Sequence, residues 1–299
     1  MKKKVMKEST AWQIGAHTVM IIGSLLAILP FILLVIASFT DNQTALVNGY
    51  SFTPEKWSLE AYQYIASEWA TIGRAYLMTI LVTVIGTALS LGITSTFAFA
   101  VSNDKLPGHK ILMFLCIFTM LFNGGLVASY YVYSNIFHIK NTIWALIIPN
   151  YLVSAFNVIL VKNYYQNSVP DSLIEAAQLD GASELKIFFK VMLPLAVPTV
   201  ATISLFTGIC YWNDWTNGLY YVSNEKLYSI QMLLMKIMNN IQALRSNSTA
   251  ALLGTGSVDL PGTAIRMAMA VIGILPILLV YPFIQKYLVR GVVVGAVKG

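Results

Sequence analysis

Residues that could carry out catalysis are few in this chain and lie far apart in the sequence. The 299 residues include three histidines, His17, His109 and His138, and two cysteines, Cys116 and Cys210. They form no HExxH or CxxC motif, and the chain has no GxxxxGK[ST] phosphate loop, the spacings that bring such side chains into one site. We therefore expect a protein without a catalytic or metal site of its own.

A stretch rich in charged side chains lies between Pro170 and Pro198 and reads PDSLIEAAQLDGASELKIFFKVMLPLAVP. Ser172 has Glu175 three residues later, the spacing of a capping box, which predicts the start of a helix. Gly181 can adopt the left-handed conformation that ends a helix. The pattern predicts a short helix, a glycine hinge and a second helix.

The second helix is expected to start at Ser183. Its apolar residues recur at the spacing of one helical face; they are Leu185, Phe188, Phe189 and Met192. An ordinary amphipathic loop between membrane spans explains this periodicity equally well.

Polar and aromatic side chains gather in three apolar stretches of the chain. They are Asn123, Tyr130 and Tyr131 in the first, Trp144, Asn150 and Asn157 in the second, and Tyr211, Trp212, Asn213 and Trp215 in the third. Sugars have apolar ring faces and many hydroxyls, so a path for them would combine aromatic rings with amide side chains. Trp and Tyr also form interfacial belts in membrane proteins, and Asn can join helices. Both interpretations stay open.

Asp214 directly follows an apolar stretch and lies in the aromatic segment Tyr211–Trp215 (YWNDW). An acid inside a membrane span indicates a functional site. At the outer end of a span, the same acid can simply be solvated. The sequence supports both interpretations equally.

Composition indicates that lipid is part of the solvent of this chain. Hydrophobic residues make up 57% and charged residues 11%, whereas soluble domains contain about 25% charged residues. Six stretches lack Asp, Glu, Lys and Arg, and each can supply the roughly 17–25 residues with which a helix crosses a bilayer: 9–40, 75–103, 111–139, 141–161, 191–213 and 267–285. They are continuously apolar, which favours helices over barrel strands. We predict an all-α polytopic fold with six transmembrane helices.

The positive-inside rule orients these six spans. With the N-terminus in the cytoplasm, 12 of the 19 Lys and Arg residues fall in inner segments and 7 in outer segments. Acidic residues divide 6 inside and 7 outside, so the net charge of +6 lies on the cytoplasmic side. Both termini and the 163–190 loop are predicted to be cytoplasmic.

The predicted organisation along the chain is a cytoplasmic segment 1–13, a transmembrane domain 14–290 with an inner loop 163–193 and outer loops 41–74 and 214–266, and a cytoplasmic tail 291–299. The outer loops are too short for most independently stable folds. We expect a surface helix over Leu59–Trp69 and an amphipathic segment over Leu227–Ile241.

Other classes fit the chain poorly. The positive charges are dispersed at the ends of spans and do not form a clustered face, so nucleic acid is not an expected partner. The uncharged run 9–40 far exceeds the roughly 7–15 residues of a signal-peptide core, which predicts a retained first span. Cys116 and Cys210 both fall inside predicted spans, so no structural disulfide is expected.

The Pro170–Pro198 stretch resembles the EAA signature of the membrane subunits of ABC importers. The matching residues are Glu175-Ala176-Ala177, Asp180-Gly181-Ala182, Leu193-Pro194 and Pro198. In that family the two helices lie on the cytoplasmic face and dock into a groove of the ATPase subunit. The resemblance implies that the coupling element is formed by Glu175, Ala176, Ala177, Asp180 and Gly181. It also implies that Glu175 meets a basic residue of the ATPase, and that Phe188 and Phe189 pack either into the docking groove or against the protein's own spans.

Further segments resemble the MalG-type permeases of carbohydrate ABC importers, and among these the LplC/YtcP-like branch, which is associated with complex oligosaccharides. They are Phe122–Leu126 (FNGGL), Asn141–Pro149 (NTIWALIIP), Tyr211–Trp215, and the ending Tyr281–Tyr287 with Gly295–Gly299. The likeness runs from about residue 14 to the last residue. Met78 departs from it, since the family often has Asn there.

This resemblance implies a type I ABC importer permease in a bacterial cell membrane, working by alternating access. No cofactor is expected in the chain itself, because ATP and Mg would bind to the partner ATPase. The implied partners are a second homologous permease, two ATPase subunits, an extracytoplasmic solute-binding protein, the sugar substrate and membrane lipid. The implied substrate path consists of Asn123, Tyr130, Tyr131, Asn157, Trp212, Asn213 and Trp215. In this family the tail, here Lys298-Gly299, reaches between the ATPase subunits, and the loop around 246–262 enters the solute-binding protein.

Two alternatives remain. A permease for peptides or amino acids would share the EAA-like loop. A membrane-embedded sugar-lipid enzyme would show acids or histidines clustered at one membrane face, whereas this chain has only isolated ones.

Overall fold

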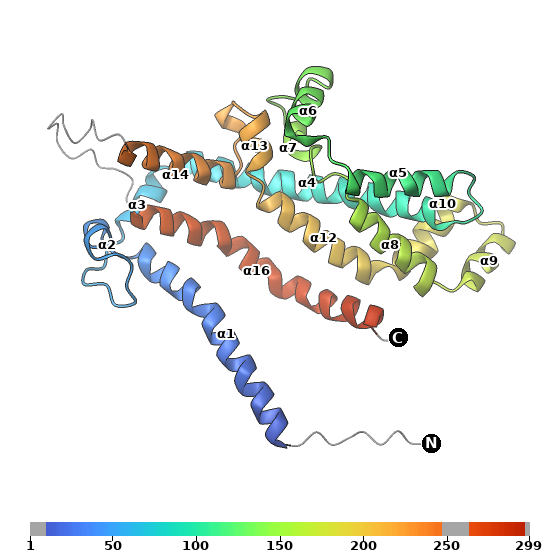
Figure 1. Ribbon diagram of the computed structural model, residues 1–299, viewed down its shortest axis with the longest axis horizontal. Helices are drawn as coiled ribbons and strands as arrows, with labels where there is room; N and C mark the ends of the chain where they lie inside the picture. The colour runs from blue at the N-terminus through green and yellow to red at the C-terminus, as the bar shows by residue number, and fades with distance from the viewer. Residues whose placement is uncertain (1–9, 247–262, 297–299) are drawn as a thin grey trace. The chain divides into compact units, whose positions relative to one another are not determined.

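The computed structural model describes residues 10–246 and 263–296, which form helices joined by short irregular segments (Figure 1). In chain order the helices are α1 (Thr10–Ser38), α2 (Asn42–Asn48), α3 (Glu60–Ser67), α4 (Trp69–Ser102), α5 (His109–Leu121), α6 (Gly125–Tyr131), η1 (Val132–Ile136), α7 (Trp144–Ile147), α8 (Ala155–Ser168), α9 (Asp171–Leu179), α10 (Glu184–Ile187), η2 (Phe188–Met192), α11 (Leu193–Leu195), α12 (Val197–Trp212), α13 (Thr216–Tyr221), η3 (Glu225–Leu227), α14 (Ile230–Ser246) and α16 (Thr263–Ala296). The described residues contain no strand beyond an isolated bridge between Thr40 and Trp57. The predicted all-α class is confirmed. Residues 247–262 of the loop that is expected to enter the solute-binding protein lie outside the described residues. So do Lys298-Gly299 of the tail that is expected to reach between the ATPase subunits.

The chain divides into two compact units. The first unit is drawn from Met1–Trp69 and Met238–Leu275, and the second from Ala70–Ile237 and Pro276–Gly299. Helices α4, α14 and α16 contribute residues to both units.

In the first unit, α1 is a long apolar helix whose side chains are exposed. Every side chain from Trp12 to Ile32 is exposed, and water does not tolerate a continuous apolar surface of this length.

Three helical stretches are long and apolar enough to cross a membrane, namely Trp12–Ser38, Trp69–Ser102 and Ala264–Pro282. They coincide with the first, second and sixth predicted spans.

The segment after α1 is a folded cap and not an irregular loop. Ser38 Oγ and Tyr62 Oη are hydrogen-bonded at 2.8 Å, and Lys56 Nζ lies 3.1 Å from Asp41 Oδ1. The surface helix predicted over Leu59–Trp69 is observed as α3 and the start of α4.

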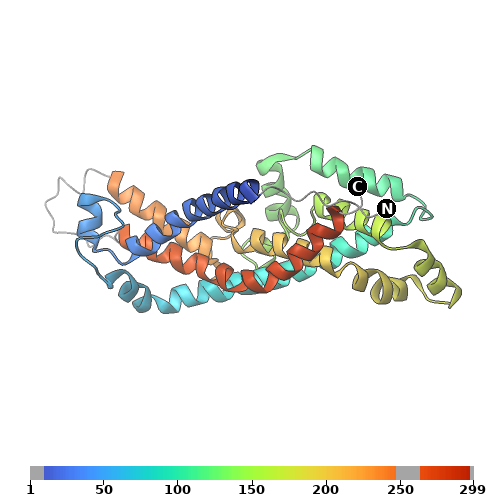
Figure 2. The ribbon, with the colours of Figure 1, turned by 90° about the horizontal axis from the view of Figure 1, so that it is seen from below.

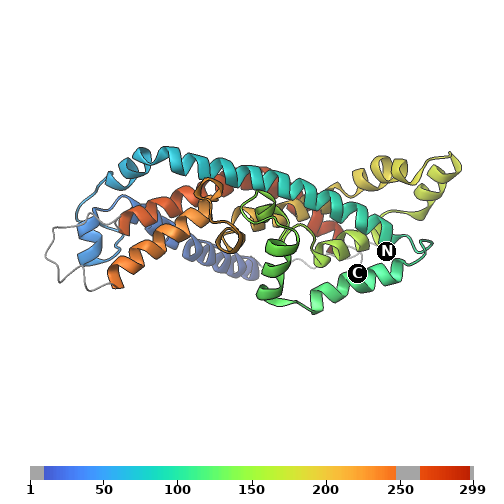
Figure 3. The same ribbon diagram turned by 90° about the horizontal axis from the view of Figure 1, so that it is seen from above.

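In the second unit, α4 is the longest element, and the other helices are arranged along it. Figures 2 and 3 show α9 beyond the C-terminal end of α4. Farther back along α4, Thr79 Oγ1 accepts a hydrogen bond from the Ile230 amide at 2.8 Å, and Gly86 contacts the ring of Tyr211. Different elements of the second unit therefore lie at different positions along the length of α4.

The predicted third and fifth spans are bent helix pairs. Helix α5 and the α6–η1 segment meet at 118°, and the α10–α11 segment meets α12 at 79°. The first bend has Gly125 at φ +80°, a conformation that favours glycine.

A single helix over the fourth predicted span, 141–161, is wrong. Helix α7 ends at Ile147, and α8 begins only at Ala155. Pro149 lacks an amide donor for a helix, and Asn150 is left-handed with φ +68°. These two residues interrupt the helix despite the apolar composition.

Candidate functional site

Helix α9 carries the charged residues of the predicted coupling element and ends in a Schellman motif. Gly181 has φ +73°. Its amide donates to the Gln178 carbonyl, and the Ala182 amide donates to the Ala177 carbonyl, each at 3.0 Å. The predicted left-handed conformation of Gly181, which ends this helix, is confirmed.

Helix α9 begins before the position predicted from the capping box. Asp171 is its first residue, and Pro170 occupies the N-cap position with no side-chain hydrogen bond. Ser172 therefore lies within the first turn, and the predicted Ser172 cap is wrong. Proline fixes its own φ near −65°, which suits the entry into the helix, and the Asp171 carboxylate lies where the helix dipole stabilises negative charge.

One side of α9 faces the protein and the other is exposed. Ile174 and Ala177 pack against the hydrophobic core of the second unit, whereas Glu175, Ala176 and Asp180 are exposed. Among the described residues, no ion pair involves Glu175.

The second helix follows Ser183 as predicted, but the predicted apolar face of this helix is wrong. Successive residues of a helix point about 100° apart, so a small rotation of the helix buries Ile187 and takes Leu185 and Phe189 out of the core. Ile187 and Phe188 are buried, whereas Leu185 is 70% and Phe189 58% exposed. The Phe188 ring lies 5.4 Å from the ring of Phe99 in the protein's own core, so the two phenylalanines face different surroundings.

A pocket of about 440 Å³ opens between α9 and the loop that joins α4 to α5. Its lining includes four carboxylate side chains and one ammonium group: Asp104, Asp171, Glu175, Glu184 and Lys105. This imbalance attracts positively charged groups.

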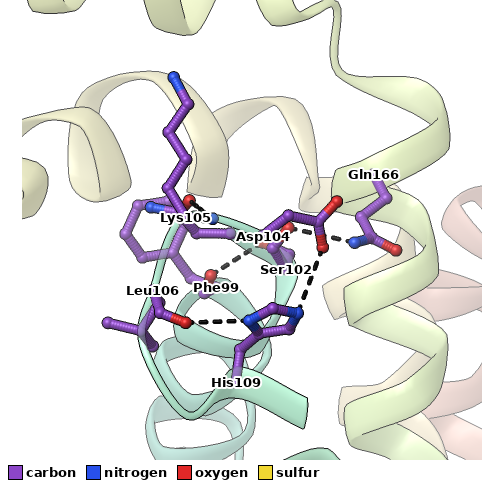
Figure 4. Close-up of polar contacts among 8 residues, drawn as sticks. Phe99, Ser102, Asp104, Lys105, Leu106, His109 and Gln166 are labelled. Carbon is purple, nitrogen blue, oxygen red and sulfur yellow. Dashed lines mark hydrogen bonds and ion pairs between the residues drawn. The ribbon is translucent and has the colours of Figure 1, made fainter.

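Hydrogen bonds hold the loop that forms the other wall of this pocket (Figure 4). The Gln166 amide on α8 donates to the Ser102 carbonyl at 3.1 Å. His109 Nδ1 is 2.9 Å from the Leu106 carbonyl oxygen and donates to it, while His109 Nε2 lies 3.7 Å from Asp104 Oδ1. The loop is therefore tied to the helix that leads into α9.

The predicted path residues of the third span have separate environments. Asn123 Oδ1 accepts a hydrogen bond from the Gly125 amide at 2.8 Å and stabilises the bend before α6. Tyr130 stacks on Tyr221 with ring centroids 5.8 Å apart, whereas Tyr131 is 59% exposed.

The remaining path residues do not share one surface either. Asn157 is buried and donates to Thr207 Oγ1 at 3.3 Å, joining α8 to α12. Trp212 is buried, whereas Trp215 is partly exposed. Asn213 donates to the Ile209 carbonyl of its own helix at 3.0 Å. For Asn157, the interpretation as a helix-joining residue has direct structural support.

Asp214 is not solvated, so that interpretation is wrong. Its side chain is buried, and Oδ1 accepts hydrogen bonds from the amides of Thr216 at 3.0 Å and Asn217 at 3.2 Å. Burial raises the pKa of this carboxyl to about 6, against the lowering effect of these bonds and of a bond from Tyr151. An Asp two residues before the first residue of a helix is a signal for this kind of turn.

Asn217 was missed by the sequence reasoning and is fully buried. Its Nδ2 donates to the Pro149 carbonyl at 3.1 Å, and its Oδ1 accepts from Asn150 Nδ2 at 2.8 Å. It thereby joins α13 to the irregular segment between α7 and α8. No sequence signal pairs residues so distant along the chain.

Residues 106–294 match the protein family described as "Binding-protein-dependent transport system inner membrane component", and the chain belongs to this family. Its members are transport subunits of the inner membrane. With apolar helices of spanning length in α1, α4 and α16, the chain is a multi-pass protein of the bacterial plasma membrane.

Two curated relatives come from Bacillus subtilis (strain 168). The polygalacturonan/rhamnogalacturonan transport system permease protein YtcP is 40% identical over 276 residues, covering 92% of this chain and 94% of that protein. Protein LplC is 34% identical over 276 residues, covering 92% and 90%. A crystal structure of a bacterial ABC transporter involved in the import of the acidic polysaccharide alginate contains a similar chain, with a TM-score of 0.77 and 29% identity over 93% of this chain and 96% of that one. The resemblance to carbohydrate ABC importer permeases is confirmed.

Proposed function

We propose that this chain is the membrane-spanning permease subunit of an ATP-driven importer for oligosaccharides. The observation that carries the proposal is the 40% identity, over 92% of this chain, to a permease named for polygalacturonan and rhamnogalacturonan transport. The alginate importer structure supports the same class of substrate.

The topology in this proposal has six spans with both termini in the cytoplasm. The three long helices and the two bent pairs supply five spans, and α7 with α8 supplies the sixth. The inner loop 163–193 and the terminal segments 1–13 and 291–299 then all lie in the cytoplasm. The loops 41–74 and 214–266 lie on the outer side.

Helix α9 and the turn that follows it form the docking element for an ATPase subunit, which carries the ATP and Mg. Leu179 is 89%, Leu185 70% and Phe189 58% exposed, an apolar surface that a partner groove would cover. Beside them, the carboxylate of Glu175 lines the acidic pocket, which suits an Arg or Lys of the partner.

Transport proceeds by alternating access, with a second permease completing the path and a solute-binding protein delivering the sugar. ATP must bind one conformation of the assembly more tightly than the other, because only differential affinity shifts a conformational equilibrium. The Schellman turn at Gly181 gives α9 a fixed geometry, so that movement of the ATPase is passed to η2 and α12.

The experiment compares Glu175→Ala and Gly181→Pro with Glu60→Ala, which changes an exposed acid of α3, in proteoliposomes that contain the whole transporter. We expect sugar uptake and sugar-stimulated ATP hydrolysis to fall about tenfold or more in the first two variants and to stay normal in the third. Wild-type uptake in both coupling variants would exclude this role for α9.

The substrate class is tested with a panel of neutral oligosaccharides, acidic oligosaccharides and short peptides. Import of peptides but of no saccharide would contradict the proposed function.

A further inference from the structure

Lys140, between η1 and α7, meets Tyr130 at the hydroxyl edge of its ring. Lys140 Nζ donates to Tyr130 Oη at 3.0 Å and is 5.5 Å from the ring centroid. Nζ is therefore 2.5 Å closer to Oη than to the ring centroid. This difference is nearly as large as the distance from Oη to the centroid itself. The ammonium therefore lies near the hydroxyl edge of the ring and away from the centre of its faces.

The ring of Tyr130 is held by other tyrosines. It stacks on Tyr221 at 5.8 Å with an interplanar angle of 15°, and Tyr133 meets Tyr221 edge-on at 5.9 Å. Among the described rings, Tyr221 is the one that pairs with Tyr130. One face of Tyr130 is thus supported by Tyr221, which belongs to the apolar cluster that Tyr130 packs against. No other ring of the described residues pairs with Tyr130.

The backbone beside Lys140 is fixed by Asn141. Asn141 has φ +59°, and its amide donates to the Tyr221 carbonyl at 3.0 Å. Its Oδ1 accepts from the amides of Ser223 at 2.7 Å and Asn224 at 3.1 Å. The ammonium of Lys140 is therefore carried by an anchored turn that also holds the tyrosine cluster.

Lys140 differs from two other cations of the predicted outer segments in having no acidic partner within the described part of the chain. Lys56 is paired with Asp41, and Lys236 with Glu225. Over residues 10–246 and 263–296, no carboxylate lies within ion-pair distance of Lys140, whose side chain is exposed. Its remaining two N–H donors are available to a ligand.

We infer that Lys140 and Tyr130 form a binding site for an acidic saccharide, with the ammonium bound to a sugar carboxylate and the ring face opposite Tyr221 packed on the adjoining sugar ring. This inference rests on the proposed function and narrows its substrate to uronic-acid oligosaccharides. An ammonium at the edge of an aromatic ring matches a saccharide that is apolar on its ring face and anionic at its edge. The alginate importer is described as transporting an acidic polysaccharide.

The experiment measures uptake of trigalacturonate and of its trimethyl ester, which keeps the sugar rings and removes the charges. The whole transporter with its solute-binding protein is tested as wild type and as Lys140→Ala, Lys140→Arg and Lys226→Ala, the last being a second exposed lysine of the outer segments. For Lys140→Ala we expect a rise of about three- to tenfold in KM for trigalacturonate, the range for a charge-assisted contact at an exposed site. Uptake of the ester should be unchanged, Lys140→Arg should retain wild-type KM, and Lys226→Ala should resemble wild type.

The outcomes separate this site from the proposed function. An equal rise in KM for both probes would show that Lys140 contacts the solute-binding protein and would overturn the site. No change in Lys140→Ala, or the same change in Lys226→Ala, would also overturn it. Import of neutral oligosaccharides with no import of trigalacturonate would overturn the inference alone, whereas import of no saccharide would overturn the proposed function as well.

Discussion

Asn150 Nδ2 donates a hydrogen bond to Asn217 Oδ1 at 2.8 Å, and this bond joins the interrupted fourth span to helix α13. Asn217 also donates to the Pro149 carbonyl at 3.1 Å. Within a membrane protein, backbone groups released by a broken helix must find partners inside the protein. Asn217 supplies such a partner from an element 67 residues farther along the chain.

Replacing Asn217 with Leu, which has a similar volume, should destabilise the protein by about 2–4 kcal/mol. The change leaves the Pro149 carbonyl and the Asn150 amide without partners in a buried place, and each unsatisfied buried group costs about 1–3 kcal/mol. Thermal unfolding of the purified transporter in detergent measures the effect. Asn213→Leu is the matched control, because Asn213 is exposed and bonds only its own helix end. Equal unfolding temperatures of the two variants would contradict the role of Asn217.

The buried carboxyl of Asp214, which follows the end of α12, should make stability depend on pH. Its pKa rises from 3.8 to about 6 on folding because of burial, so the folded state binds the proton more tightly than the unfolded chain. Stability should therefore fall as pH rises from 3.8 through about 6. Between pH 5 and pH 8 this loss amounts to about 1–2 kcal/mol.

Asp214→Asn keeps the oxygen that accepts from the Thr216 and Asn217 amides but removes the titration. The difference in unfolding free energy between wild type and Asp214→Asn should change by that amount over this pH range. A difference that is constant with pH would show that the carboxyl does not titrate there.

Much of the fold could be predicted because it depends on local composition. The apolar runs of α1, α4 and α16 each exceed the length of a membrane crossing, and Gly181 sits where a Schellman turn needs a glycine. The interruption of the fourth span is different. Its run 141–161 contains no charged residue, and its break depends on Pro149 together with distant side chains that stabilise a non-helical backbone.

The same distinction applies to the candidate site. The residues of α9 could be assigned because they are contiguous in sequence. The pocket that they line could not, because its other wall comes from Asp104 and Lys105, which only the packing of α8 against α4 brings near. The environments of Phe188 and Phe189 were also hidden, since neighbouring residues of a helix point about 100° apart and the sequence does not decide which of the two faces the core.

Gly86 is expected to tolerate no side chain, because a Cβ there would lie 2.6 Å from Tyr211 Cζ. Tyr211 Oη donates to the Ile147 carbonyl at 2.8 Å, so displacing its ring would also break a buried hydrogen bond. Gly86→Ala should destabilise the protein by about 1–3 kcal/mol through overpacking. Gly92→Ala on the same helix meets no atom within 4 Å and should be neutral or slightly stabilising. Equal unfolding temperatures for the two variants would exclude this close contact.

Phe188 and Phe189 should respond differently to replacement by alanine, which decides between docking and internal packing for each ring. Phe188 is 3% exposed and packs against Phe99, so Phe188→Ala should cost about 3–5 kcal/mol of stability. Phe189 is 58% exposed, so its removal should leave the unfolding temperature of the isolated subunit nearly unchanged. If Phe189 docks on the ATPase, Phe189→Ala should instead weaken copurification of the ATPase subunit and lower sugar-stimulated ATP hydrolysis. Normal ATPase binding in Phe189→Ala would remove this residue from the docking surface, and normal stability in Phe188→Ala would contradict its place in the core.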